Sequence, residues 1–200
     1  TPYHFEYGLA QSTLDRTATT LSVGDKHLRF GKDFISFLPE TREAEAVLVG
    51  YGIHAPDLGW DDYLMVDVRG KWAVIFEGLP HPKEVPFKDH PNHPAITMEA
   101  RQKASLKSGA VGLIILRASR PASESEFEKA LSTPRIQLEG TTSLMPEPAL
   151  PRIDIYPSGQ KSLGLGLEQA NRTLKGRVQP AAPQSLGTWK LNWVMRKERI

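Results

Sequence analysis

Two short apolar runs, residues 46–49 and 72–76, constrain the fold more than any other feature of the sequence. Each run is nearly continuous in aliphatic and aromatic side chains, a pattern typical of strands that are covered on both faces. The connection between them, 50–71, is long and is punctuated by glycine, aspartate and aromatic residues. We therefore expect a buried sheet that carries a long, structured loop at one strand end.

The next part of the sequence predicts a helix followed by another buried strand. Thr97 is placed to act as the N-cap of a helix over 97–107, and Gly109 stands where helices commonly end in a left-handed residue. Residues 111–116 then form the most strand-like run of the chain. A strand–helix–strand succession of this kind predicts a crossover between two parallel strands.

Shorter elements complete the expected fold. We predict a hairpin-like succession of strands over 20–38, strands over 151–156 and 189–195, helices over 123–131 and 158–170, and irregular structure over 133–149. Together these elements indicate a β-rich α/β fold, a β-sandwich or open sheet with flanking helices. A parallel-strand crossover lies within it, and the terminal strands meet beside it.

Composition excludes several classes of function. Of the 200 residues, 40% are hydrophobic and 24% are charged, as in ordinary globular proteins. The net charge is only +2 and the basic residues are scattered, which argues against a nucleic-acid partner. There is no cysteine, so disulfides and thiolate-bound zinc are excluded, and no apolar run approaches the length of a membrane-spanning helix.

The sequence offers no set of residues for catalysis. His90 and His93 stand three residues apart in a proline-broken loop, a spacing that favours a solvated loop over a metal site. A hydrolase that binds metal through His81, His90 and His93 is the competing hypothesis. Asp61 and Asp62 are adjacent, so in an extended chain their carboxylates point apart. We expect one of them to hydrogen-bond the backbone near Tyr63.

Three pieces of the long connection carry a family resemblance when they are taken together. They are 50–53 (Gly-Tyr-Gly-Ile), 61–63 (Asp-Asp-Tyr) and 67–71 (Asp-Val-Arg-Gly-Lys). The combination resembles the protease-associated (PA) domain that zinc-dependent aminopeptidases of the M28 family carry as an insertion. The resemblance divides the chain into flanking strands (1–44), a PA-like domain (45–172) and returning strands (173–200). It also implies neighbouring termini, because an insertion leaves and re-enters its host at adjacent points.

The resemblance implies a non-catalytic role for this chain. The peptidase domain of the family binds two zinc ions, and its ligand motifs, such as His-x-Asp and Glu-Glu, do not occur here. No catalytic or metal-binding residue is therefore assigned in this sequence, and zinc is expected in a peptidase domain outside it. The chain begins without methionine and stops in a strand-like pattern, so a longer parent protein is expected. The resemblance implies that this parent is exported to the periplasm, cell envelope or exterior.

The implied partner is a peptide substrate or the peptidase domain of the same chain. The domain would modulate substrate access or contacts between domains or subunits; the alternative is a free-standing peptide-binding or sorting module. The predicted contact residues combine polar tips with aromatic area: His54, Asp57, Trp60, Asp61 and Tyr63. If this loop is an exposed contact surface, replacing Trp60 and Asp61 by alanine should shift stability by no more than roughly 1 kcal/mol.

Overall fold

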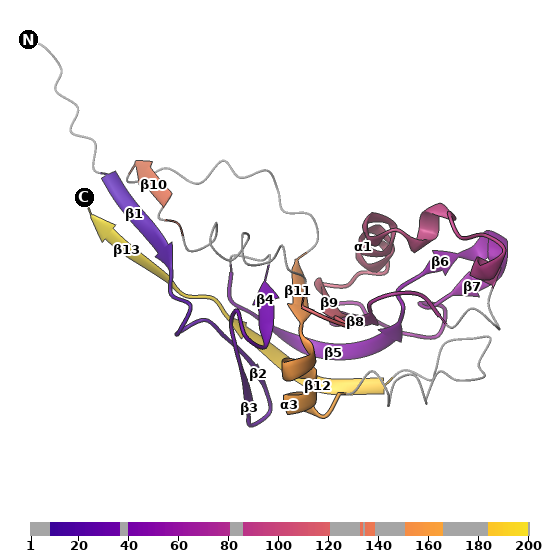
Figure 1. Cartoon of the computed structure of the whole chain (residues 1–200), viewed down its shortest axis with the longest axis horizontal. Coiled ribbons are helices and arrows are strands. Elements are labelled where there is room, and N and C mark those ends of the chain that lie inside the picture. Colours follow the sequence, from indigo (N-terminus) through magenta and orange to yellow (C-terminus); the bar gives the residue numbers. More distant parts are fainter. Residues whose placement is uncertain are drawn as a thin grey trace, which may run out of the picture.

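A mixed eight-stranded sheet forms most of the molecule (Figure 1). The computed structural model describes residues 9–36, 40–80, 86–120, 133, 135–138, 151–165 and 184–199. The strands of this sheet, in spatial order, are β3 (Lys26–Arg29), β2 (Thr20–Val23), β12 (Gln184–Asn192), β5 (Arg42–Gly50), β8 (Trp72–Phe76), β9 (Gly112–Leu116), β11 (Arg152–Ile155) and β4 (Phe34–Ser36). The protein thus has the β-rich α/β fold that the sequence predicts.

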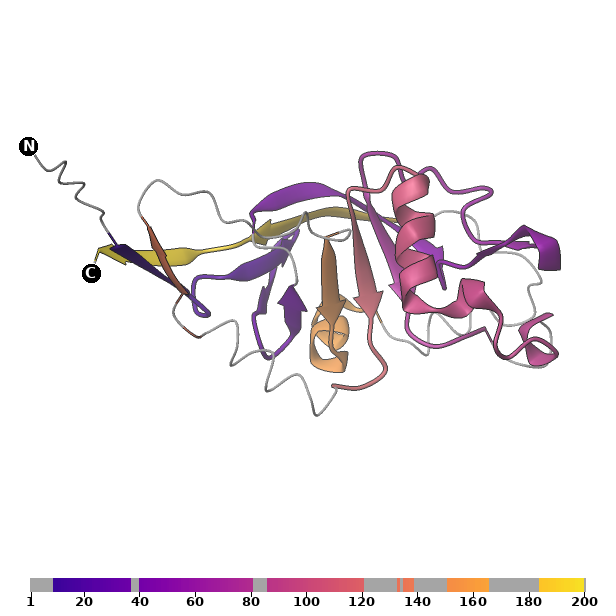
Figure 2. The same ribbon diagram turned by 90° about the horizontal axis from the view of Figure 1, so that it is seen from above.

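Four parallel strands lie side by side in the middle of this sheet. They are β5, β8, β9 and β11, paired in that order. The helix α1 (Met98–Lys107) connects β8 to β9 and covers one face of β5, β8 and β9 (Figure 2). Its N-cap is Thr97, whose hydroxyl accepts a hydrogen bond from the amide of Ala100 at 3.2 Å. The predicted crossover between parallel strands, including its cap, is confirmed.

The sheet curls until its two edges meet. β3 and β4 are the outermost strands, yet only residues 30–33 separate them in the chain. Phe30 forms a β-bridge with Phe34, and the amide of Gly31 donates to the carbonyl of Phe34 at 2.8 Å. β4 therefore pairs with β11, and it does not continue the hairpin-like succession expected over 20–38. This near closure leaves few unpaired strand edges.

Alternate residues of the parallel strands fill two separate apolar layers. Trp72, Val74, Ile114 and Ile153 point into the curled sheet, where they meet side chains of β2, β3, β4 and β12. The opposite face of β8 and β9 packs under α1. Close packing requires glycine at position 112, since a Cβ there would lie 2.1 Å from the Trp72 ring. Both faces are thus covered, as the continuous apolar runs predict.

A second sheet joins the two ends of the chain. Its strands are β10 (Arg135–Leu138), β1 (Leu9–Leu14) and β13 (Met195–Arg199), with β1 in the middle. Ala10 pairs with Arg199, and Figure 1 shows the N- and C-terminal strands running together, so the expected meeting of the terminal strands is confirmed. β10 corrects the expectation of irregular structure throughout 133–149, because β1 supplies a pairing partner that no local pattern reveals.

The remaining elements are short. α3 (Pro157–Leu163) follows β11 and ends at Gly164, whose φ of 74° is left-handed, so within the described residues the helix stops earlier than the predicted 158–170. The helix predicted over 123–131 lies outside the described residues. No helix in the described ranges is long and apolar enough to cross a membrane. The division of the chain at 44/45 and 172/173 stays a prediction.

Candidate functional site

The polar groups of the structure gather where the parallel strands end. β5, β8 and β9 finish at Gly50, Phe76 and Leu116, which are neighbours along one edge of the sheet. In sheets with parallel strands, the carboxyl edge is the usual place for ligand-binding and catalytic groups, because the loops leave the sheet there. The long connection 50–71 leaves from this edge and carries the residues that the sequence singles out.

The carboxylate of Asp62 ties the two ends of this connection together. Its Oδ2 accepts hydrogen bonds from the backbone amides of Tyr51, at 3.1 Å, and Ile53, at 2.9 Å. Its Oδ1 accepts from Nε1 of Trp60 at 3.1 Å, and the amide of Asp62 donates to the carbonyl of Ile53 at 2.9 Å. A single buried side chain thus satisfies donors from both sides of the loop, as buried polar groups require.

The two glycines of the Gly-Tyr-Gly-Ile piece are explained by this arrangement. Gly50 and Gly52 have φ values of 109° and 71°, which other residues rarely adopt. A Cβ at Gly50 would also lie 3.3 Å from Oδ1 of Asp62, and one at Gly52 would lie 2.8 Å from the side chain of Ile75. Positions 50 and 52 must therefore be glycine, so that the backbone can turn the amides of Tyr51 and Ile53 toward the carboxylate.

Burial dominates the electrostatics around Asp62. Asp62 is only 1% exposed. Desolvation raises the pKa of its carboxyl to about 6, although its hydrogen bonds and the charge of Arg101 lower that pKa. Arg101 of α1 is also buried, which lowers its pKa, and its guanidinium donates to the carbonyl of Gly78 at 2.8 Å. Burial likewise raises the pKa values of Tyr51 and Tyr63.

The connection continues as a small hairpin of β6 (His54–Ala55) and β7 (Trp60–Asp61). Across it, Nδ1 of His54 lies 3.0 Å from Oδ2 of Asp61. Oδ1 of Asp61 accepts from the amide of Tyr63 at 2.9 Å, which confirms that one of the paired aspartates bonds the backbone near Tyr63. The aspartates point to different partners, so they do not form a carboxylate dyad.

A second loop, 86–97, packs against this hairpin. Nε2 of His93 lies 2.9 Å from Oδ2 of Asp57, and this hydrogen bond is the main reason that the pKa of Asp57 is lowered. The Phe87 ring lies between Trp60 and His93, with centroid distances of 5.8 and 6.2 Å. The hairpin and the loop are therefore joined by both an aromatic and a polar contact.

The predicted contact residues divide into two groups in the structure. His54 and Asp57 are exposed and Asp61 is partly exposed, so their contact with a substrate or partner stays a prediction. Trp60 and Tyr63 are only 6% and 9% exposed. The premise that these two rings lie at the surface is wrong, because the loop folds back onto the sheet and buries them, and the small stability change expected for Trp60 falls with it.

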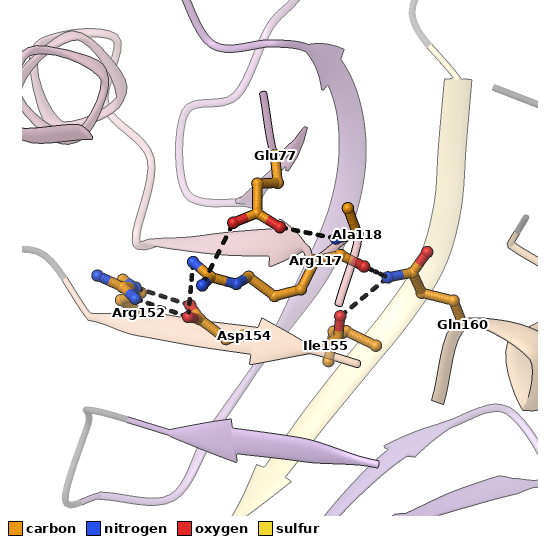
Figure 3. A network of polar contacts seen from close by, with 7 residues as sticks. All are labelled: Glu77, Arg117, Ala118, Arg152, Asp154, Ile155 and Gln160. Carbon is orange, nitrogen blue, oxygen red and sulfur yellow. Dashed lines mark hydrogen bonds and ion pairs between the residues drawn. The ribbon is translucent and has the colours of Figure 1, made fainter. Parts of the chain in front are cut away.

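Sequence reasoning missed a further charged network beside this site (Figure 3). Asp154 in β11 is completely buried, and Arg152 binds both of its oxygens, at 2.7 and 2.6 Å. Arg117, just after β9, lies between Asp154, at 3.6 Å, and Glu77, at 3.2 Å. The available signal was an aspartate between two isoleucines, with an arginine two residues before it, since an unpaired carboxylate is rarely buried.

Backbone contacts hold this network at the strand ends. Glu77 accepts from the amide of Ala118 at 2.7 Å, and Gln160 of α3 donates to the carbonyls of Arg117 and Ile155 at 2.6 and 2.9 Å. Glu77 also acts on the charge of Arg101, which faces Asp62. Acidic and basic side chains thus alternate from Asp62 through Arg101, Glu77, Arg117 and Asp154 to Arg152. Such an arrangement can hold loops in place.

The histidine cluster is not assembled into a metal centre by the described residues. His93 is bonded to Asp57, His90 is exposed, and His81 lies outside the described residues. Over the ranges that the structure describes, no group of three or more His, Cys, Asp or Glu side chains could hold a metal ion. The competing hypothesis of a histidine-based hydrolase remains untested.

Comparison with known proteins gives similarity to aminopeptidases. No protein-family model and no curated protein matches the chain. An aminopeptidase from Aneurinibacillus sp. strain AM-1 is similar with 18% identity and a TM-score of 0.43, over 99% of this chain and 36% of that chain. Two structures of BSAP, a zinc aminopeptidase from Bacillus subtilis, are also similar, both with 12% identity. Their TM-scores are 0.39 and 0.41, over 97% and 96% of this chain, and each match covers 35% of that chain.

The chain therefore spans about a third of the length of these enzymes. Similarity at this level assigns neither a family nor an activity to it.

Proposed function

We propose that this chain is a non-catalytic, PA-type domain of an M28-type zinc aminopeptidase, and that it modulates the access of peptides to the peptidase domain. The observation that carries the proposal is the convergence of the three motif pieces. Residues 50–53 and 61–63 meet at the carboxylate of Asp62. The third piece, 67–71, leads into β8, where the amide of Gly70 donates to the carbonyl of Gly109 at 2.9 Å.

This convergence gives the resemblance a physical basis. Each piece alone is a short pattern that recurs by chance. Here the glycines make room for the aspartate, the aspartate holds the strand end, and the third piece carries the chain from the loop into the sheet. Residues that depend on one another in this way are expected to occur together, as they do in the family that the sequence resembles. The paired terminal strands also suit an insertion, which needs adjacent ends.

The exposed part of the 54–61 hairpin is the proposed contact surface. His54, Asp57 and Asp61 offer polar groups there, and the buried Trp60 and Tyr63 hold the hairpin in place from below. Peptides, with their charged amino end, or a facing surface of the peptidase domain are the proposed partners. Zinc would belong to that domain, and the exported location follows from the family in the same way.

The first prediction is that the 200-residue chain does not hydrolyse aminoacyl substrates. Its residues do not supply the paired zinc sites that this chemistry uses. The measurement is an aminoacyl-anilide assay with added zinc, with the full-length parent as the positive control. Turnover by the chain that a chelator abolishes, and that His90→Ala and His93→Ala remove, would instead support the histidine-based hydrolase.

The second prediction concerns substrate length in the full-length protein. The double variant His54→Ala/Asp57→Ala should change KM severalfold for longer peptides and leave kcat for a short aminoacyl-anilide unchanged, because only longer chains reach the hairpin. Asp67→Ala is the matched control, since this exposed aspartate lies outside the hairpin. Equal kinetics for wild type and double variant at every length would exclude the access role. A reading frame without zinc-ligand motifs next to this chain would favour the free-standing module.

A further inference from the structure

We propose that a buried water molecule is bound between α1 and the 50–71 connection, by Nε of Arg101 and the hydroxyls of Ser105 and Tyr63. Each of these three atoms is buried, and none has a hydrogen-bond partner within the described residues. Buried polar groups in native proteins are almost always hydrogen-bonded, and internal water is the usual partner where the protein supplies none. The three atoms therefore define a site for a small molecule that can form hydrogen bonds.

The buried side of α1 is polar, whereas the side of a helix that packs on a sheet is ordinarily apolar. Arg101 and Ser105 are the buried residues of this helix, and their spacing of four residues places them on the same face. The guanidinium of Arg101 is fixed at one end, because it donates to the carbonyl of Gly78 at 2.8 Å. Apolar packing does not explain a buried arginine and a buried serine one helical turn apart, but a bound polar molecule does.

Tyr63 approaches this polar face from the connection. Burial raises the pKa of its hydroxyl, while Ser105 and the charge of Arg101 lower it, so the three side chains lie close together. The hydroxyls of Tyr63 and Ser105 nevertheless do not meet the geometry of a hydrogen bond, because both oxygens are without a partner. Gly52 leaves room beside the Tyr63 hydroxyl, since a Cβ at position 52 would lie 3.2 Å from this oxygen.

The chemistry of the three groups identifies water as the ligand. Nε of an arginine only donates, whereas a hydroxyl both donates and accepts, so a direct bond between the two hydroxyls would still leave Nε without an acceptor. One water molecule accepts from Nε and bonds to each hydroxyl, which gives about three hydrogen bonds, the usual number for internal water. An anion is less suitable, because Asp62 and Glu77 already act on the positive charge of Arg101.

This inference goes beyond the proposed function and does not depend on it, since it concerns how the connection is attached to α1. The bound water joins the returning part of the connection to the helix beside it. It thereby helps to hold the hairpin in place, whatever the hairpin contacts. The test locates the water itself and uses no activity assay.

The first measurement is a high-resolution crystal structure of the wild-type chain. We expect one density peak at about 2.7–3.2 Å from each of the three atoms. Crystals soaked in bromide distinguish water from a halide, and no anomalous peak is expected at the site. An anomalous peak there would assign the site to an anion and overturn the proposal. A direct bond between the two hydroxyls, with no density beside Nε of Arg101, would overturn it as well.

The second measurement is made in solution and follows the Nε proton of Arg101 by ¹⁵N NMR. We expect an Overhauser transfer from a water that stays bound for longer than the protein takes to tumble. It is recorded in the rotating frame, where exchange with solvent has the opposite sign. Nε of Arg69 is the matched control, because it is exposed and donates directly to Asp67 at 2.8 Å, so it should show no such transfer.

Two variants exclude a signal that the hydroxyl protons relay. Tyr63→Phe and Ser105→Ala each remove one hydroxyl and leave the water two partners, which is sufficient for an internal water. The transfer to Nε of Arg101 should therefore persist in both variants. Its absence in the wild-type chain, or its loss in either variant, would reject the bound water.

Discussion

Replacing Asp154 by alanine is expected to lower the free energy of unfolding by about 3–5 kcal/mol, the usual effect of removing one partner from a buried ion pair. Asp154 is completely buried and is the shared partner of Arg152 and Arg117. Without it, two guanidinium groups that are partly shielded from water each lose a carboxylate partner, although Arg117 keeps Glu77 at 3.2 Å. The lost charge pairing, more than the lost hydrogen bonds, accounts for the size of the effect.

The chain contains a matched control for this prediction. Asp67 is bound by Arg69 two residues away, just as Asp154 is bound by Arg152, with distances of 2.8 and 3.3 Å against 2.7 and 2.6 Å. The side chain of Asp67 is 57% exposed, so Asp67→Ala should change stability by no more than about 1 kcal/mol. Urea unfolding of the three proteins at neutral pH measures the difference. Equal costs for the two variants would show that burial of the Asp154 network is energetically unimportant.

The parts of the fold that the sequence predicts are those that depend on local pattern. β8 and β9 are continuous apolar runs, and α1 has its cap and its glycine stop within a few residues of its ends. β4 and β10 depend instead on partners far away in the chain. β4 has three residues and pairs with β11 because the sheet closes, and β10 exists as a strand beside β1. Neither partner can be identified from the strand's own residues.

The same distinction applies to the candidate site. The unusual φ of Gly50 and Gly52 and the backbone bond of Asp61 are local, and the motif pieces point to them. The burial of Asp62 is not local, and Arg101, the basic group that acts on its pKa, lies on α1, outside the connection. Likewise, the side chain of Trp60 has the polar and aromatic character of a surface contact. Only the packing of the 86–97 loop shows that it is buried.

Replacing Trp60 by alanine is expected to destabilise the protein by about 3–5 kcal/mol, the range for removing a buried large aromatic side chain. The indole packs against Phe87 and fills the space between the hairpin and the second loop. Its Nε1 also donates to Oδ1 of Asp62, so the substitution removes one of the three donors to a buried carboxylate. Cavity formation and the lost hydrogen bond act in the same direction.

Two companion variants separate these contributions and identify what the hairpin does. Trp60→Phe keeps most of the ring volume but removes the donor, so it should lose about 1–3 kcal/mol, the cost of leaving a buried polar group unsatisfied. Asp61→Ala removes a partly exposed acceptor and should lose about 1 kcal/mol or less. Thermal and urea unfolding measure all three. A change below about 1 kcal/mol for Trp60→Ala would mean that the ring is a surface contact after all. The predicted order instead makes Trp60 the brace that holds His54, Asp57 and Asp61 in position for their proposed partner.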